Sequence, residues 1–320
     1  MRRAATVLAL ALAALAPAGC GLALGPAPSA VQLLVTSEFG AHLLHRSGVL
    51  HAHEGETVLD LLSRSLPVRT GAHGDAVASI DGLAGGSERA RTGQVSTWSY
   101  YVNGVRVAVA PARRGVHPGD HVWWDLHDSA DEPATPAVVG SFPEPFLNGI
   151  EGKRLPVRVE CASDSGSACS TVTNSLQRLG VPAAVAAIGS GGAPETLRVM
   201  VGPWVYLEDD LEAQSIGHGP RASGVYALPA LYGHRLTLLD PEGRAVRTLR
   251  GEAGLIAATT GPKEAPVWVI TGTDVAGVQL AARSLKQTTL AGHFAVAVAP
   301  GAVIPLPVSA PPAPGRSPAL

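Results

Sequence analysis

Residues 98–104, WSYYVNG, followed by VRVAV at residues 105–109, decide the fold of the N-terminal part of this chain. Aromatic and β-branched residues favour strands, and an Asn-Gly pair between two such runs is the strongest short-range hairpin signal. A second turn, Pro118-Gly119-Asp120, leads into an aromatic run at residues 121–126. The sequence therefore predicts a β-hairpin and a third aromatic strand.

One short helix accompanies these strands. Apolar residues recur at helical spacing within residues 57–66, and Pro67 ends the run. Further strands are predicted upstream and downstream of the helix, at residues 31–36, in a hairpin over residues 42–53 broken at Ser47-Gly48, and at residues 77–80. One helix against several short strands predicts an α+β fold, with a β-grasp-like first domain at residues 30–128.

A family resemblance rests on the order of four motifs, which are GETVLDLL (55–62), SIDG (79–82), WSYYVNG (98–104) and HPGDHVWW (117–124). In this order they resemble a bacterial domain of unknown function that is similar to the C-terminal β-domain of transcobalamin and intrinsic factor. The resemblance covers residues 31–126. It implies a β-grasp-like module that in those carriers covers one face of a corrin ring, so a cobalamin-type ligand is expected and no covalently bound cofactor. The large helical barrel of the carriers has no counterpart in this sequence.

The aromatic strands suggest where a ligand could bind. Strand alternation places Tyr101 and Asn103 on one face of their strand, and His121 and Trp123 on one face of the later strand. These residues share a face of the sheet if the two strands are neighbours. If one face is the core under the helix, the other displays aromatic and histidine side chains that suit a flat conjugated ligand or a partner protein. The alternative is that Trp123 packs on the linker or the second domain. The candidate ligand-binding residues are Trp98, Tyr101, Asn103, His121 and Trp123.

A second domain is predicted at residues 142–303, after a linker at 129–141. It opens with a strand, a helix and a strand, at 155–160, 170–179 and 183–188, in a βαβ-like pattern. Two later segments, 196–216 and 266–285, share the form strand, glycine turn and amphipathic helix. These patterns predict an α/β domain with a mixed sheet. The Pro-rich residues 304–320 are expected to be an extended or disordered tail.

The first 20 residues read as an export signal. Three residues, Met1-Arg2-Arg3, precede an apolar stretch at 4–16, which is too short to span a bilayer as a helix. Small residues directly before Cys20 resemble the lipobox of bacterial lipoproteins, in which the cysteine is acylated and becomes the mature N-terminus. The alternative is ordinary cleavage after Ala18 or further along the chain, in which case Cys20 has no special role. We therefore expect a signal peptide at 1–20, a tether at 21–29, and a protein lipid-anchored, through chains such as palmitate, to the outer face of the bacterial cytoplasmic membrane.

Cysteine and histidine usage bears on redox and metal chemistry. Cys161 and Cys169 enclose a polar loop, and in an exported protein such a pair predicts a disulfide. The spacing does not favour a metal site, and no metal is predicted. Four histidines, His42, His45, His51 and His53, are close in sequence and could start a zinc or copper site, but solvated surface residues are the favoured interpretation.

Composition and motifs narrow the function classes. The formal net charge of −2 offers no basic excess for nucleic acid. None of the common catalytic motifs occurs in its proper context, so no enzyme is predicted. Gly272-Thr273-Asp274 lies where a strand meets a helix, as an anion site would, although Asp274 is more simply an N-cap.

Three hypotheses follow. The first is a non-catalytic cell-envelope lipoprotein that binds a small conjugated ligand such as a corrinoid, or a partner protein, and serves an uptake system through a transporter component. The second is a structural or adhesive envelope protein that binds cell-wall polymer or a surface partner. The third, an envelope hydrolase working at Gly272, is the weakest.

Overall fold

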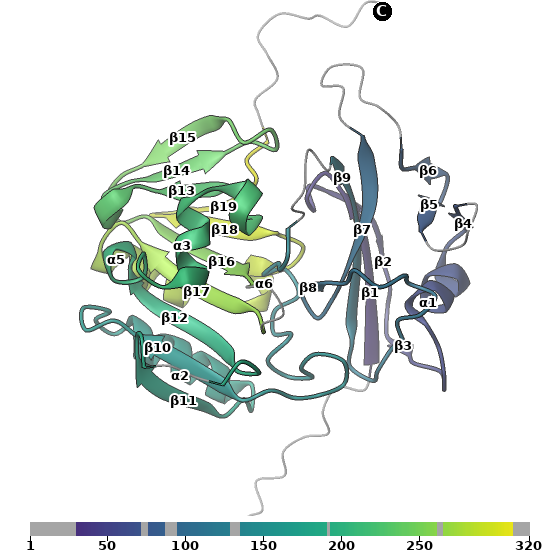
Figure 1. The fold of residues 1–320 in the computed structure, drawn as a ribbon, viewed down its shortest axis with the longest axis horizontal. Coiled ribbons are helices and arrows are strands. Elements are labelled where there is room, and N and C mark those ends of the chain that lie inside the picture. The colour runs from purple at the N-terminus through teal and green to yellow at the C-terminus, as the bar shows by residue number, and fades with distance from the viewer. Residues whose placement is uncertain are drawn as a thin grey trace, which may run out of the picture.

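The computed structural model describes residues 30–71, 76–86, 95–128, 135–190, 193–260 and 265–309. The expected signal peptide, Cys20 and the tether lie outside these residues. The described chain forms two domains side by side, each built on its own sheet (Figure 1). The α+β expectation is confirmed. Within the described ranges, no helix has the length and apolar character needed to cross a bilayer.

The first domain is a six-stranded sheet in the order β2-β1-β9-β7-β8, with β3 also paired to β1. Its parallel pair, β1 with β9, lies next to the antiparallel pair β9 with β7. The Asn103-Gly104 turn joins β7 to β8 with positive φ at both residues, as the hairpin signal requires. The strands are β1 (Ala30–Ser37), β2 (His42–Arg46), β3 (Leu50–His51), β7 (Ser96–Val102), β8 (Val105–Arg106) and β9 (His121–Asp128).

The helix α1 (Val58–Ser65) covers one face of this sheet, on the side away from the second domain (Figure 1). The GETVLDLL motif explains where it starts, because Thr57 and Asp60 form a reciprocal capping box. The hydrogen bonds from Thr57 also lower the pKa of Asp60. Leu61 and Leu62 are fully buried against the sheet. A small sheet of β4 (Val68–Thr70), β5 (Val77–Ile80) and β6 (Leu83–Ala84) follows the helix.

The histidine-rich segment is not the hairpin that we expected over residues 42–53. Strands β2 and β3 do not pair with each other; both pair with β1, β2 beside its C-terminal half and β3 beside Ala30 and Val31. The Ser47 hydroxyl accepts a hydrogen bond from the Leu33 N–H at 2.9 Å, so this interruption is itself bound to β1. The segment is one interrupted edge of the sheet.

The second domain is a seven-stranded mixed sheet in the order β11-β10-β12-β17-β16-β18-β19. Strands β11, β10, β12 and β17 are parallel, which confirms the βαβ opening, and the remaining neighbours are antiparallel. The bounds are β10 (Val157–Cys161), β11 (Ala183–Ala187), β12 (Leu197–Pro203), β16 (Gly254–Thr259), β17 (Val267–Gly272), β18 (Ala295–Ala299) and β19 (Ala302–Leu306).

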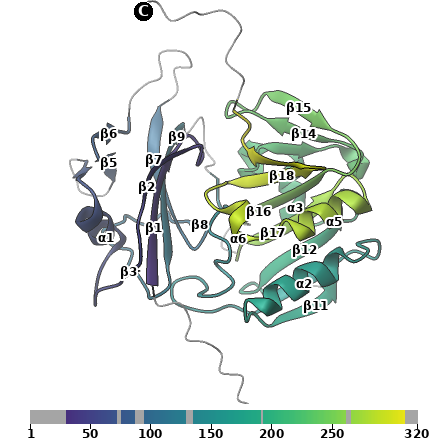
Figure 2. The same cartoon turned by 180° about the vertical axis from the view of Figure 1, so that it is seen from behind.

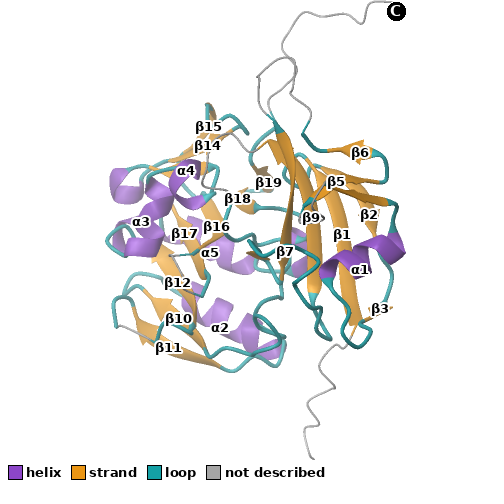
Figure 3. Cartoon of the chain, turned by 45° about the vertical axis from the view of Figure 1, so that its right-hand side comes forward, coloured by secondary structure: helices purple, strands orange, loops and turns teal. Residues whose placement is uncertain are grey.

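Both faces of this sheet are covered, as the views from behind and from the side show (Figures 2 and 3). Helices α2 (Ala168–Arg178) and α5 (Val275–Arg283) pack on one face. The other face carries α3 (Leu211–Gly217) and a three-stranded sheet. The small sheet comprises β13 (Ala227–Pro229), β14 (Leu236–Leu239) and β15 (Ala245–Leu249), and the short helical segments are η1 (Trp204–Tyr206), α4 (Pro220–Ser223), η2 (Leu231–Gly233) and α6 (Gln287–Leu290).

The two similar segments meet in the middle of this sheet. Their strands, β12 and β17, are parallel neighbours. Their helices diverge, because α3 packs on one face and α5 on the other. Each segment therefore forms a strand, a turn and a helix as predicted, but the two helices pack on opposite faces of the sheet.

Two expected boundaries need correction. Residues 135–141 of the expected linker are mostly buried. They are also bonded to both domains, because the Val138 N–H donates to the Gly104 carbonyl and the Val139 N–H donates to the Phe294 carbonyl. The remaining linker residues lie outside the described chain. The second domain also extends beyond residue 303, because β19 runs to Leu306 and Leu306 is buried. The Pro-rich tail thus contributes an edge strand.

The disulfide expected from the cysteine spacing is confirmed. Cys161 at the end of β10 is bonded to Cys169 in the first turn of α2, with their Cα atoms 5.8 Å apart. The bridge closes the loop between β10 and α2 at the C-terminal end of that strand.

Candidate functional site

The second domain covers the sheet face on which Tyr101 and Trp123 were expected to be displayed. Both side chains are fully buried. The ring of Phe294, just before β18, lies edge-on at 5.2 Å from the Trp123 ring and 5.5 Å from the Tyr101 ring, centre to centre. The expectation of an open face is wrong, and the alternative that Trp123 packs on the second domain is confirmed. These aromatic residues form the core of the interdomain contact.

A buried carboxylate organises the first-domain side of this contact. Asp125 accepts hydrogen bonds from two backbone N–H groups of the β1–β2 turn, at 3.0 and 2.9 Å, and lies 2.8 Å from His127 Nδ1. The Thr36 hydroxyl donates to Asp125 and accepts the indole N–H of Trp123 at 2.7 Å. Because a buried charge is tolerated only when it is well hydrogen-bonded, this network stabilises the interface.

Asn103 and His121 are occupied by the protein itself. Asn103 Nδ2 donates to Asp120 Oδ1 at 2.9 Å and to the Gly149 carbonyl at 2.8 Å, and its Oδ1 accepts from the His121 N–H at 2.8 Å. The His121 ring nitrogen Nδ1 lies 2.8 Å from Ser141 Oγ. The Asn-Gly and Pro-Gly-Asp turns are thus bonded to each other and to the start of the second domain, and these buried polar atoms are engaged without a ligand.

Two buried titratable groups near this junction make the free energy of unfolding depend on pH in opposite directions. Burial, with Arg46 nearby, lowers the pKa of His121 to about 4. Burial also raises the pKa of Glu144 to about 7, although Asn148 N–H and Nδ2 donate to its carboxylate. As pH falls from 6.5 towards 4, the unfolded chain protonates its histidine while folded His121 stays neutral, so stability is lost. As pH rises from 4.5 towards 7, the unfolded chain ionises its glutamate while folded Glu144 stays protonated, so stability is again lost.

We expect these opposing slopes, each about 1.4 kcal/mol per pH unit, to offset each other in the natural protein. Glu144→Gln should remove one slope, so that between pH 4.5 and pH 6.5 the free energy of unfolding rises by roughly 2 kcal/mol more than in the natural protein. Buried His293, whose pKa is also lowered by burial, acts in the same direction as His121. Urea unfolding at stepped pH is the measurement. Equal pH profiles for the natural protein and Glu144→Gln would contradict the assignment.

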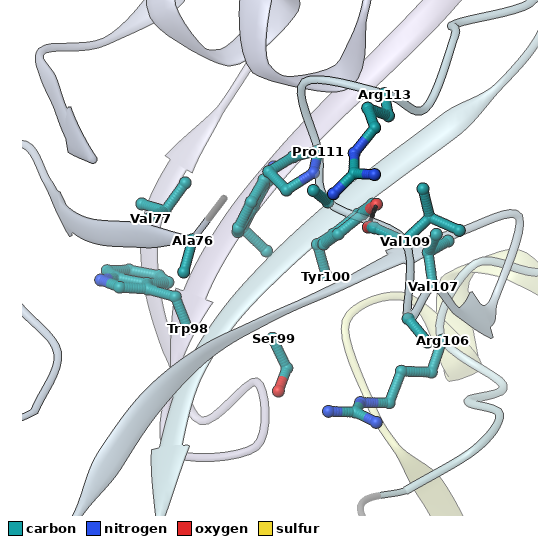
Figure 4. A pocket seen from close by; sticks show the side chains of 13 residues that line it. Ala76, Val77, Trp98, Ser99, Tyr100, Arg106, Val107, Val109, Pro111 and Arg113 are labelled. Atoms are coloured by element: carbon teal, nitrogen blue, oxygen red, sulfur yellow. Dashed lines mark hydrogen bonds between the residues drawn. The ribbon is translucent and has the colours of Figure 1, made fainter. Parts of the chain in front are cut away.

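The opposite side of strand β7 borders an open cavity of about 310 Å³. The Trp98 and Tyr100 side chains line it, together with Trp124 from β9, whose ring stacks on Tyr100 at 4.8 Å between ring centres. In Figure 4 the indole of Trp98 lies at one end of the pocket and the guanidinium of Arg106 at the other. The remaining wall comes from the start of β5, from Ser99 of β7 and from the segment after β8: Ala76, Val77, Ser99, Val107, Ala108, Val109, Ala110, Pro111 and Arg113.

Local contacts fix the aromatic wall. The Tyr100 hydroxyl donates to the Val109 carbonyl, which ties the outer segment to the strand, and burial raises the pKa of Tyr100 to about 12. The Trp98 indole N–H donates to the Leu83 carbonyl at 3.3 Å. The indole N–H of Trp124 is buried and has no hydrogen-bond partner among the described residues. An acceptor supplied from the pocket would relieve the cost of that unpaired donor.

Among the described residues that line the pocket, Arg106 and Arg113 are the only charged ones, and none is an aspartate or glutamate. Guanidinium groups bind carboxylates and phosphates through paired N–H donors and also stack on aromatic planes. Aromatic walls with arginines at one end therefore suit a flat ligand that carries an anionic group.

A second cavity, of about 280 Å³, lies in the other domain beside Arg158 and Arg198. Both guanidiniums bond the fully buried Glu160. Arg198 also donates to Asp210 at 2.5 Å and Glu212 at 2.9 Å. Hydrogen bonding to Glu160 raises the pKa of Arg198. The guanidinium N–H groups of Arg198 are already bonded to these carboxylates, so this cluster is a structural ion-pair network.

Comparison with known proteins locates a family within the first domain. Residues 55–128 match a domain of unknown function, DUF4430. The DUF4430 domain runs from the turn before α1 to the end of β9, and every residue that lines the 310 Å³ pocket falls within it. No curated protein matches the chain.

Sequence reasoning assigned the pocket face of the DUF4430 domain to the core. The alternation of β7 was predicted correctly, since Tyr100 packs with the α1 side of the sheet and Tyr101 on the opposite side. Tyr100, Trp124 and Arg106 were nevertheless missed as pocket residues, because α1 covers only part of its face. The signal was available in residues 107–111, an apolar run that ends in proline and is too irregular to complete the sheet.

The remaining candidate positions are structural or dispersed. Asp274 caps α5 by accepting the Gly277 N–H at 2.7 Å, and it also accepts the Glu252 N–H at 2.8 Å, so the N-cap interpretation is confirmed. In the described ranges, histidine, cysteine and acidic side chains form no group of three or more that could hold a metal.

Proposed function

We propose that this chain is a non-catalytic ligand-binding protein of the bacterial cell envelope, exported and anchored through a lipid on Cys20. Its DUF4430 domain would hold a flat conjugated ligand with an anionic group, such as a corrinoid, in the pocket beside Trp98. The observation that carries the proposal is the pairing of three aromatic walls with Arg106 and Arg113 in a cavity of about 310 Å³. The resemblance to the transcobalamin β-domain supports the corrinoid class.

The cavity size favours partial enclosure of such a ligand. Pockets for small molecules start at roughly 300 Å³, and this one is at that lower limit and open to solvent. An extended conjugated ring would therefore insert one edge between Trp98 and the arginines and leave the rest accessible. An accessible ligand can be passed on, which suits a protein that serves a transporter component in an uptake system.

Titration of the purified protein with cobalamin and with cobinamide tests the ligand. We expect cobalamin to bind more tightly, because its phosphodiester can pair with the arginines and cobinamide lacks that group. Trp98→Ala should weaken binding at least about tenfold, since loss of an aromatic contact and its buried area exceeds about 1.4 kcal/mol. Arg106→Ala should weaken cobalamin binding and leave cobinamide binding nearly unchanged.

Tyr232→Ala is the matched control, because Tyr232 is an exposed aromatic residue of the second domain, far from the pocket lining. It should leave both affinities unchanged. If neither corrinoid binds at ~100 μM, a concentration at which even a weak site with ΔG° of about −5.5 kcal/mol is half occupied, the corrinoid proposal fails. Retention of the protein by purified cell wall, without affinity for either corrinoid, would favour the structural or adhesive alternative.

The anchor has its own test at Cys20. A single acyl chain gives marginal membrane binding and two or more give a stable anchor, so the natural protein should fractionate with membranes. Cys20→Ala should block lipid attachment and leave the protein released or held as an uncleaved precursor. Mass spectrometry of the N-terminal peptide is the direct measurement. An N-terminal peptide that starts at Gly19 or Gly21 without acyl mass would rule out the lipid while leaving export intact.

A further inference from the structure

The outer edge of the second sheet is an unprotected strand. Strand β11 pairs only with β10, and among the residues that the structure describes no strand pairs with its other side. Ala184, Val185 and Ala187 are exposed, and 60 % of Val185 is accessible. Alternate residues of an edge strand direct N–H and C=O groups outward, so β11 offers a free row of hydrogen-bonding groups.

Two other edges of the large sheets are blocked by their own residues. Strand β2 carries His42, His45 and Arg46, and a bulge in its pairing with β1 disturbs the edge. At the far edge of the second sheet, β19 contains Pro305. Charges, bulges and proline are the usual devices that prevent strand addition. The sequence of β11, AAVAA, contains none of them.

The chain segment that contains β11 is also depleted of charge, and the charged residues of the neighbouring strand β10, Arg158 and Glu160, are paired with each other. Arg178 is the only charged residue between Asp164 and Glu195, a span that includes α2 and β11. The whole chain has 16 % charged residues, so the depletion is local. Leu179, just after α2, is also 37 % exposed. Loss of charge with exposed apolar side chains marks the core of a protein interface.

We propose that a second copy of this chain pairs with β11, strand to strand and antiparallel, about a two-fold axis at Val185. The sequence itself favours a copy over a foreign strand, because AAVAA reads the same in both directions. An antiparallel pair centred on Val185 therefore places valine opposite valine and alanine opposite alanine, with no charge to repel. The two seven-stranded sheets would join into one, and the two α2 helices would lie side by side across the axis.

Cysteine cross-linking in cells tests whether two β11 strands pair when the protein is in its natural location. Residues directly opposite in an antiparallel pair have Cβ atoms about 5 Å apart. Val185→Cys should therefore form an intermolecular disulfide on mild oxidation and migrate at twice the monomer mass. Val303→Cys is the matched control, because Val303 is 50 % exposed on the other edge strand, β19. A dimer band for both variants, or for neither, would overturn the proposal.

Sedimentation of the purified protein gives an independent readout. At ~100 μM, above the micromolar Kd expected of the weaker standard-size interfaces, the natural protein should sediment as a dimer. Val185→Lys should be monomeric, because it places two like charges opposite each other across the axis. Val303→Lys should remain dimeric, which separates the edge from a general effect of added charge. A monomeric natural protein at this concentration would overturn the proposal.

Discussion

Trp123→Ala is expected to lower the free energy of unfolding by about 4 kcal/mol, the cost typical of removing a fully buried large aromatic side chain. Trp123 is 0 % exposed and its ring meets Phe294 of the second domain. The change also removes the indole N–H that binds Thr36, which leaves the Thr36–Asp125 pair without its third member. The substitution would leave an empty space between the two domains. Both domains should therefore lose stability together.

Urea unfolding followed by far-UV circular dichroism measures this loss, and proteolysis reports whether the domains separate. Trp98→Ala is the matched control on the same sheet. The Trp98 side chain is half-buried and lines the pocket, so its removal should cost no more than about 2 kcal/mol. Equal losses for the two tryptophan variants would contradict the role of Trp123 as the centre of the domain contact.

Glu160→Gln should cost the protein about 3 kcal/mol, because it leaves buried positive charge without its partner. The carboxylate of Glu160 is fully buried and accepts hydrogen bonds from Arg158 Nε at 2.8 Å and from Arg198 Nε and Nη2 at 3.0 and 2.8 Å. Glutamine keeps the shape and loses the charge, so the loss reports electrostatics and not packing. Arg198 retains Asp210 and Glu212, which limits the damage on its side.

The comparison that isolates burial is Glu195→Gln. Glu195 pairs with Lys153 at 2.5 Å, and both side chains are well exposed. An exposed ion pair adds little to stability, since water screens it, so no measurable change is expected from this variant. Added salt should not alter the Glu160→Gln loss greatly. Similar stability of the two glutamine variants would show that the buried network contributes less than its geometry indicates.

Local patterns in the sequence predicted most individual elements. The Asn-Gly turn, the helix over GETVLDLL, the βαβ opening and the disulfide all follow from rules that involve neighbouring residues. The capping box at Thr57 and Asp60 and the φ > 0 turn at Asn103-Gly104 show why, because each is stabilised within a few residues of itself.

Non-local pairing was harder to foresee. Residues 42–53 have the composition of a hairpin. In the structure β2 and β3 instead pair with β1, on either side of Ser47, and together they cover the outer edge of β1. Residues 304–306 were assigned to a Pro-rich tail, but Pro305 is tolerated on an edge strand, where its missing N–H needs no partner. In both cases the partner strand, and not the segment itself, determined the structure.

The sequence alone determined that Tyr100 and Tyr101 lie on opposite faces of their strand, as Trp123 and Trp124 do on theirs, because side chains alternate along a strand. The structure pairs Tyr101 with Trp123 across β7 and β9. Only the tertiary structure decided which face is open. The second domain placed Phe294 against Tyr101 and Trp123, while α1 left Trp98, Tyr100 and Trp124 beside a cavity. Strand periodicity is a local property of the backbone, whereas the choice of covered face depends on which apolar surfaces, distant in sequence, bury each other most completely.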